Sequence, residues 1–237
     1  MEIRTDLERV LWHEIGHLCI DLIEIEDSPD FFVDDLWVNY HKIAISEHKW
    51  EGGIRMLPSI KYEVLLQDDD KTSFALLGLI SGCVFQTLYL KEFLKDADVG
   101  FEDCFCIQQK CGGRGDIMSF LEITSLIRRK YGLNRDFIQF IERELQHIYY
   151  DIITKNQEFL GELHSLISHY KAIVYDVYEQ SENKDKFEYS LKGNYLDSLK
   201  EEVFKLMKGT GFYDAVKELK ESIKEKMTEV QKSSTAS

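Results

Sequence analysis

Apolar residues recur at intervals of three or four over most of the chain, which is the spacing that places them on one face of a helix. The first such run follows Thr5-Asp6-Leu7-Glu8, a capping-box pattern. In this pattern the Thr5 hydroxyl and the Glu8 carboxylate accept hydrogen bonds from N–H groups at the helix start. Asp27-Ser28-Pro29 should end the run, because a proline disfavours helical conformation in the residue before it. These signals predict a long first helix between Thr5 and Asp27.

A different pattern, dense in β-branched and aromatic residues, occupies residues 36–46 and predicts a strand. Gly52-Gly53 then indicates a turn, and residues 60–66 are the candidate for a second strand. The most apolar stretch, residues 74–89, is slightly short for a membrane span and includes polar side chains. We therefore expect it to be a buried helix of the core.

Helical spacing resumes near Asp116 and continues almost to the end of the chain. Its interruptions are Gly132, the polar residues 181–186 and Gly209-Thr210-Gly211. The predicted fold is mostly α (α+β), a helical domain with a small sheet over residues 1–180. A helical extension over residues 181–232 and a disordered tail over residues 233–237 are expected to follow.

Composition indicates a folded, acidic protein. The 237 residues are 44% hydrophobic and 30% charged, and the formal net charge is −14. An acidic surface argues against nucleic acid and anionic membranes as partners, because both are bound through clustered Lys and Arg. The chain opens without a secretory signal and has five cysteines, so we expect free thiols in the cytoplasm. Cys104, Cys106 and Cys111 lack the paired spacing of zinc ribbons, which favours ordinary thiols over a second metal site.

His13-Glu14-Ile15-Gly16-His17 is an H-E-x-x-H sequence inside the first predicted helix. Residues four apart share one helical face, so the imidazoles of His13 and His17 can reach the same zinc ion. Glu14 adjoins the first ligand, where its carboxylate can act as general base toward a water on the metal. The alternative is two ordinary histidines on a helix, and the cap and the apolar neighbours of the motif weigh against it.

Two histidines leave the zinc short of a protein ligand. The metzincin continuation fails, because Ile20 and Ile23 stand where its glycine and third histidine would be. Asp116 follows several glycines, where an aspartate is also a natural helix N-cap, so the residues alone leave its role open. His41 and His48 flank the predicted strand and could approach a substrate, although surface or core placement is the simpler interpretation.

Residues 10–20, VLWHEIGHLCI, look like the zinc helix of the peptidase module of FtsH-type AAA proteases. Weaker matches follow in the order of that family: a strand at residues 38–46, a helix at residues 77–85, and closing helices near residues 141–163. Gly112-Gly113-Arg114-Gly115-Asp116 resembles the family's G-x-x-x-D segment, whose aspartate is the third zinc ligand. The next helix ends in Tyr131-Gly132-Leu133, as the family's does. The resemblance covers about residues 5–170 and implies that Asp116 joins His13 and His17 on the metal.

The chain departs from this family in three respects. Ser81-Gly82-Cys83-Val84 replaces an A-A-E stretch and lacks its acidic residue, so the role of that residue is in doubt here. No G-x-x-x-x-G-K-[ST] phosphate loop occurs, so we expect no ATPase module. Residues after about 183 have no recognised counterpart.

The leading hypothesis is a cytoplasmic, ATP-independent zinc metallopeptidase. Its substrate would be an unfolded or extended peptide that pairs with the edge of the strand at residues 36–46. One alternative is a non-catalytic zinc-binding interaction module, which a cysteine or histidine as fourth ligand would favour. Another is a regulatory peptidase that cleaves a repressor, although no helix-turn-helix signature accompanies the motif.

The predicted C-terminal helices carry one further apolar face, made by Leu196, Leu199, Val203 and Leu206. This face could bind a helper partner or a second copy of the chain, or it could pack on its own domain.

Overall fold

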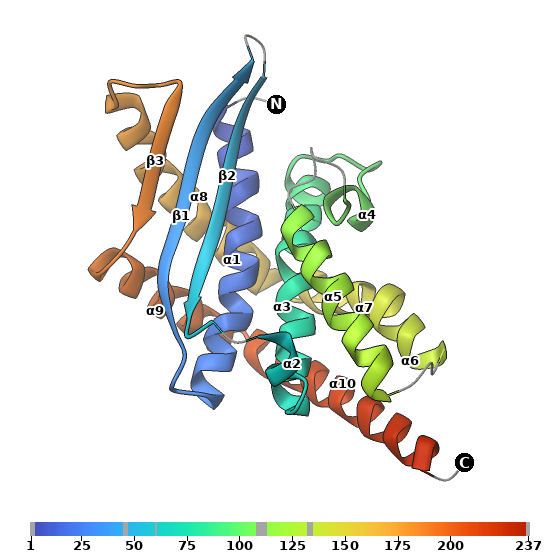
Figure 1. Ribbon diagram of the computed structural model, residues 1–237. Helices are drawn as coiled ribbons and strands as arrows, with labels where there is room; N and C mark the ends of the chain where they lie inside the picture. The colour runs from blue at the N-terminus through green and yellow to red at the C-terminus, as the bar shows by residue number, and fades with distance from the viewer. Residues whose placement is uncertain (1–2, 45–46, 60, 108–112, 132–134, 236–237) are drawn as a thin grey trace.

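A computed structural model describes residues 3–44, 47–59, 61–107, 113–131 and 135–235. Its three strands, β1 (Phe32–Ala44), β2 (Glu47–Leu57) and β3 (Lys186–Leu191), form one antiparallel sheet (Figure 1). The long helices are α1 (Ile3–Asp27), α3 (Asp69–Leu88), α5 (Arg114–Tyr131), α7 (Leu145–Lys155), α8 (Gln157–Gln180), α9 (Asn194–Gly209) and α10 (Phe212–Thr235). The short ones are α2 (Tyr62–Leu65), α4 (Phe101–Cys104) and α6 (Arg135–Gln139), with π-helical turns at Tyr89–Phe93 and Phe140–Glu144. The predicted mostly α fold with a small sheet is confirmed.

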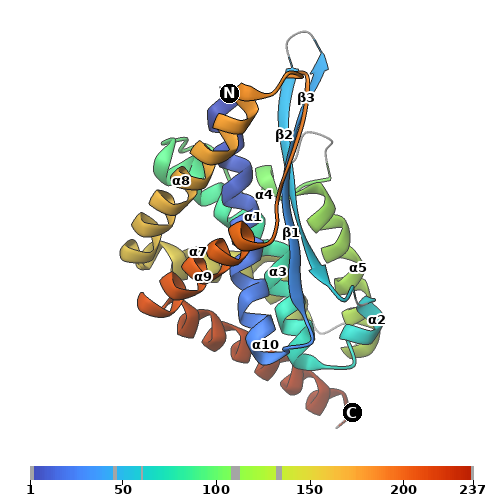
Figure 2. The same cartoon turned by 90° about the vertical axis from the view of Figure 1, so that its left-hand side faces the viewer.

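Helix α1 is the central element, because it packs against the sheet on one side and against α3 on the other. Figure 2 shows the sheet nearly edge-on, with α1, α8 and α9 on the same side of it. Gly16 permits the close approach of α3, since a Cβ there would lie 2.8 Å from the carbonyl oxygen of Ser81. The helix ends at Asp27 as predicted.

The predicted capping box at the start of α1 is wrong. The helix already includes Ile3, so Thr5 and Glu8 lie within it rather than at its boundary. The Glu8 carboxylate instead accepts hydrogen bonds from Lys171, at 2.5 Å, and from Ser168, at 3.3 Å, both on α8. Glu8 therefore forms an ion pair with Lys171 of α8 and does not cap its own helix.

Strand β1 lies in the middle of the sheet, in the order β2-β1-β3. Its inward residues alternate along the strand, and Leu36, Val38 and Tyr40 are almost completely buried. Val38 pairs with Gly52 of β2 on one side and with Tyr189 of β3 on the other. The strand predicted at residues 36–46 therefore corresponds to β1 as far as Ala44, and residues 45–46 lie outside the described part. Residues 36–41 of β1 are paired on both sides.

The second strand was predicted at the wrong place. Residues 62–65 form a short helix, and Gly52-Gly53, predicted to be a turn, lie in the middle of β2. A Cβ on Gly52 would lie 2.7 Å from Val10 and 2.8 Å from Glu14 of α1, and a Cβ on Gly53 would lie 2.5 Å from the Trp37 indole. The two glycines thus serve close packing on both faces of the strand rather than a reversal of the chain.

The apolar stretch at residues 74–89 is a buried helix, as predicted. It forms most of α3, whose start is capped by Asp68 through hydrogen bonds from the N–H groups of Asp70 and Lys71. By length and composition alone, the helical segment Asp69–Phe93 would be able to cross a membrane. However, 83% of its most apolar window is buried inside the protein.

Residues 181–232 share the core of the preceding residues and contain a strand that was not predicted. Strand β3 completes the sheet, and α10 packs along α3 and α7. Lys217 of α10 binds Asp27 at 2.8 Å, and Lys220 binds Asp70 at 2.9 Å. Helix α10 continues to Thr235, so residues 233–235 are helical rather than part of a disordered tail, and residues 236–237 lie outside the described part.

The apolar face of α9 packs on its own chain. Leu196, Leu199, Val203 and Leu206 are each at most 9% exposed. This face is therefore not available to a helper partner or a second copy in the folded chain.

Candidate metal centre

Three side chains from two helices converge on one point beside the sheet. On α1, the Nε2 atoms of His13 and His17 lie 3.1 Å apart. On α5, Oδ2 of Asp116 lies 3.1 Å from His13 Nε2 and 3.5 Å from His17 Nε2. A tetrahedral zinc with bonds of about 2.0–2.1 Å holds its ligand atoms about 3.3 Å apart. The predicted ligand set is thus brought together at a spacing that fits one zinc ion.

Asp116 does not cap α5. The N–H of Ile117 donates to the carbonyl of Gly113 at 3.0 Å, so Gly113 occupies the N-cap position and Asp116 lies in the first turn. The Asp116 carboxylate is directed at the two imidazoles. The sequence left open whether Asp116 is a helix N-cap or a metal ligand. The geometry favours the metal ligand, which is the role that the resemblance to FtsH-type peptidase modules implied.

The ring of His17 is oriented by α3. Its Nδ1 lies 2.8 Å from the carbonyl oxygen of Gly78 and donates to it, which leaves Nε2 as the nitrogen that faces His13 and Asp116. Gly82, one turn further along α3, lies directly against both rings. A Cβ there would be 2.3 Å from His17 Nε2 and 2.7 Å from His13 Nε2. The backbone of α3 therefore forms one wall of the site.

The electrostatics of the site favour a positive charge at its centre. Burial works against the charged form of Asp116, yet the facing imidazoles hold its pKa well below the usual range. Burial also works against protonation of His17, but the Asp116 carboxylate outweighs it and raises the pKa of His17 to about 10. The His17 imidazole thus holds a proton tightly beside the ionised Asp116 carboxylate, and a metal cation can take the place of that proton.

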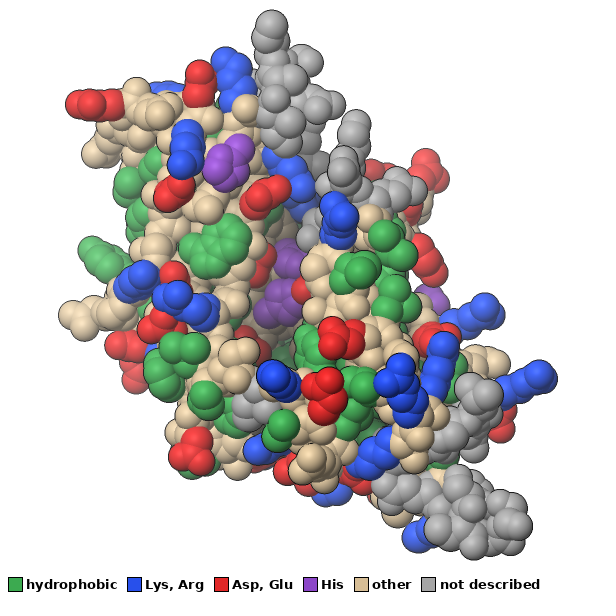
Figure 3. Space-filling view, viewed as in Figure 1, with side chains coloured by type: hydrophobic (Ala, Val, Ile, Leu, Met, Phe, Trp, Pro, Cys, Tyr) green, Lys and Arg blue, Asp and Glu red, His purple; other side chains and the backbone are tan. Residues whose placement is uncertain are grey.

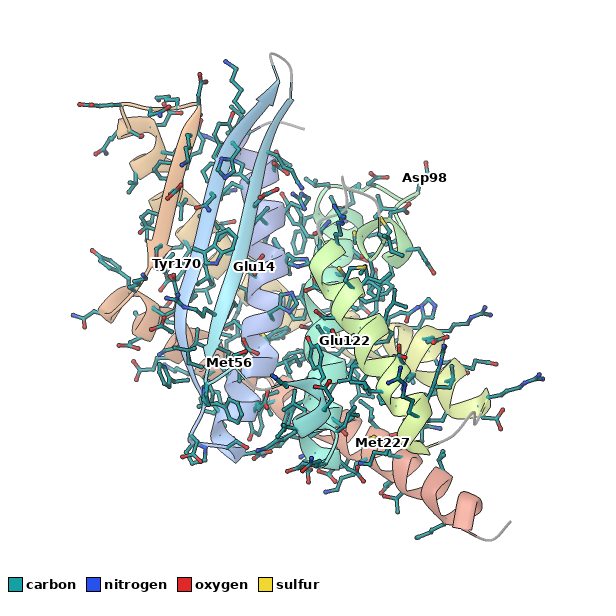
Figure 4. All side chains as sticks on the ribbon, viewed as in Figure 1. Glu14, Met56, Asp98, Glu122, Tyr170 and Met227 are labelled. Carbon is teal, nitrogen blue, oxygen red and sulfur yellow. The ribbon has the colours of Figure 1, made fainter. Side chains whose placement is uncertain are left out.

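Glu14 lies on the side of α1 that faces β2. Its side chain is 5% exposed, and it packs so closely on the strand that a Cβ on Gly52 would lie 2.9 Å from Glu14 Oε1 (Figure 4). Burial raises the pKa of Glu14, and the charges of His13 and His17 offset part of this effect. A carboxyl with a raised pKa is suited to accepting a proton near neutral pH.

A cleft of about 650 Å³ opens over these residues. Its floor includes His13, Glu14 and His17, one wall comes from β2, and Asp116 lies on the opposite side. Figure 3 shows histidine side chains at the bottom of this hollow. Because β2 is an outer strand of the sheet, its free edge borders the cleft, and the strand at residues 36–46 does not supply that edge.

Sequence reasoning missed Cys83, a buried residue of α3. Its Sγ lies 4.0 Å from Asp116 Oδ2, and the ligand atoms of Cys83, His13 and Asp116 are all within 4.8 Å of one another. This group could hold a metal ion; it shares His13 and Asp116 with the triangle described above but does not include His17. The sequence did carry one signal. Where the FtsH-type family has an A-A-E stretch, this chain has Ser81-Gly82-Cys83-Val84, and the cysteine in it is a residue type that binds metals.

The other residues considered from sequence are not brought into this group. His41 lies on β1, and the side chain of His48 is outside the described part of the structure. Cys104 is buried and Cys106 half-buried, while Cys111 lies outside the described residues. Buried and half-buried thiols agree with the prediction for Cys104 and Cys106.

Comparisons with protein-family models, with characterised proteins and with solved structures found no match. The resemblance to FtsH-type peptidase modules therefore stays a prediction, supported by the residues that carry it.

Proposed function

We propose that this chain is a zinc-dependent endopeptidase that cleaves unfolded or extended peptides. One observation carries the proposal: the ligand atoms of His13, His17 and Asp116 lie within 3.5 Å of one another in the cleft that Glu14 also lines. A carboxylate next to a metal-ligand triangle is the arrangement that hydrolysis of a carbonyl requires.

The residues would divide the work as follows. His13, His17 and Asp116 would hold the ion, and the Gly78 carbonyl orients the ring of His17. Bound zinc supplies a Lewis acid that polarises a carbonyl and acidifies water. Glu14 accepts the proton of the attacking water and returns it to the departing amine. Its burial beside β2 keeps competing solvent away from the carboxylate.

The free edge of β2 is suited to hold the substrate. An extended peptide can add to an exposed sheet edge through main-chain hydrogen bonds, and this edge borders the cleft that contains Glu14. A folded protein keeps its backbone in its own hydrogen bonds, and opening it costs several kcal/mol. We therefore propose that the chain acts without ATP on disordered segments and short peptides.

A paired digestion tests this proposal. One stably folded protein, and the same protein permanently unfolded by chemical modification, are each incubated with zinc-loaded wild type and with Glu14→Gln. We expect wild type to cleave the unfolded form, and Glu14→Gln to be slower by roughly 100- to 10,000-fold while keeping its zinc. Equal cleavage by wild type and Glu14→Gln would contradict the assignment of Glu14 as the base. No cleavage of the unfolded form by zinc-loaded wild type would contradict the peptidase proposal itself.

A non-catalytic zinc protein is the second candidate, and Cys83 is the observation that favours it. A structural zinc is held by four protein ligands, whereas a catalytic one keeps a position open. The sulfur of Cys83 lies close enough to His13 and Asp116 to supply a fourth ligand. The presence of Glu14 in the cleft favours the peptidase, because a structural site has no need of a base.

A further inference from the structure

Cys83 lies where three helices, α1, α3 and α5, come together. Cys83 follows Gly82 on α3, is 0% exposed, and faces the point where His13 of α1 and Asp116 of α5 meet. Its sulfur lies on the His13 and Asp116 side of the cluster, 4.0 Å from Asp116 Oδ2. The thiol therefore belongs to the surroundings of the metal centre and not to a separate part of the core.

The start of α5 leaves room for this sulfur. A Cβ on Gly113 would lie 2.1 Å from Cys83 Sγ, a separation that no real side chain tolerates. The same Cβ would be 3.4 Å from Asp116 Oδ2, so Gly113 lies against both the sulfur and the carboxylate. In this position the thiol donates to the carbonyl of Cys104 at 3.4 Å.

The types of ligand atom in this cluster favour zinc over other divalent ions. Two imidazoles, one carboxylate and one thiolate make four ligands, which is the number that zinc takes in tetrahedral sites. A thiolate is a soft ligand that suits zinc and disfavours magnesium, calcium and manganese, which prefer oxygen. Without the sulfur, the three remaining ligands would discriminate less strongly among these ions.

We propose that Cys83 is a fourth ligand of the His13, His17 and Asp116 site, and that its sulfur closes the site until a peptide displaces it. This inference rests on the proposed function and adds a way in which access to the site is regulated. Coordination releases the thiol proton to solvent, and dissociation takes one proton back. The neutral thiol then donates to the Cys104 carbonyl and to Asp116 Oδ2, as it does in the structure at 3.4 Å and 4.0 Å.

Cobalt substitution tests the ligand directly, without reference to activity. Wild type loaded with Co²⁺ should show near-ultraviolet thiolate-to-cobalt charge-transfer absorption. Cys83→Ser should lose that absorption and bind zinc at least roughly 10- to 100-fold more weakly. Cys104→Ser is the matched control, since Cys104 is equally buried and adjacent, and it should keep both properties.

A second measurement does not depend on any variant folding. X-ray absorption of zinc-loaded wild type should show one sulfur at about 2.3 Å beside lighter ligands at about 2.0–2.1 Å. Metal bound with no sulfur neighbour, or charge-transfer absorption that survives in Cys83→Ser, overturns the role of Cys83 and leaves the peptidase proposal standing. A wild type that binds neither metal overturns this inference together with the zinc site itself.

Discussion

Gly82→Ala adds a single methyl group and should nevertheless disturb the candidate site strongly. The added methyl carbon would lie 2.3 Å from His17 Nε2, about 1 Å inside the distance at which ordinary contact begins. The rings have to move by about that amount, whereas zinc–ligand distances hold within about 0.2 Å. Overpacking of this kind costs about 1–3 kcal/mol, which corresponds to a roughly 5- to 150-fold loss of zinc affinity when metal binding bears the cost.

Gly78→Ala is the matched control on the same helix, one turn earlier. Its Cβ would meet only Ile20, at 3.8 Å, and the carbonyl that accepts from His17 is kept. Alanine in place of glycine in a helix also stabilises by up to about 1 kcal/mol. Zinc affinity, measured by competition with a chromophoric chelator, should therefore fall in Gly82→Ala alone, while circular dichroism shows that both variants fold. Wild-type zinc affinity in Gly82→Ala would refute the placement of α3 against the imidazoles.

Two further predictions concern stability. Burial, reinforced by the charge of Glu14 and partly offset by His17, raises the pKa of Asp21 from 3.8 to about 7. In metal-free protein the folded state therefore holds the Asp21 proton more tightly, and this group's contribution to stability declines as pH rises from about 4 to 7. Asp21→Asn should gain stability over wild type across that range in denaturant titrations, and a difference that does not vary with pH would contradict the shift. Leu199→Ala should lower the free energy of unfolding by about 2–5 kcal/mol, since Leu199 is 1% exposed, whereas Tyr195→Ala, at an exposed position, should change it by less than about 0.5 kcal/mol. Equal effects of these two substitutions would show that α9 is not part of the core.

Local signals predicted the elements whose cause is local. The end of α1 at Asp27 follows from the proline two residues later, and the burial of α3 follows from its apolar run. The spacing of His13 and His17 predicted that they share a face of one helix, which is a property of helical geometry alone. The break at Gly209–Gly211 likewise separates α9 from α10 as expected.

Features that depend on distant contacts were missed. Gly52 and Gly53 read as a turn because their packing partners, Glu14 and Trp37, are not adjacent in sequence. Strand β3 was missed although Phe187, Tyr189 and Leu191 alternate with polar residues, because the run is only six residues long and follows a charged, polar segment. Pairing with β1 supplies most of the reason for the strand. Cys83 was missed as a candidate ligand because only the crossing of α1, α3 and α5 brings it to the candidate metal centre.

The metal content of purified wild type and Asp116→Ala tests the central claim most directly. The two proteins, both shown to be folded, are measured for zinc per chain after identical loading and dialysis. The ligand triangle predicts about one zinc per chain in wild type and a strong loss in Asp116→Ala, because Oδ2 is one of its three corners. Equal zinc in the two proteins would contradict the claim that Asp116 joins His13 and His17 on the metal.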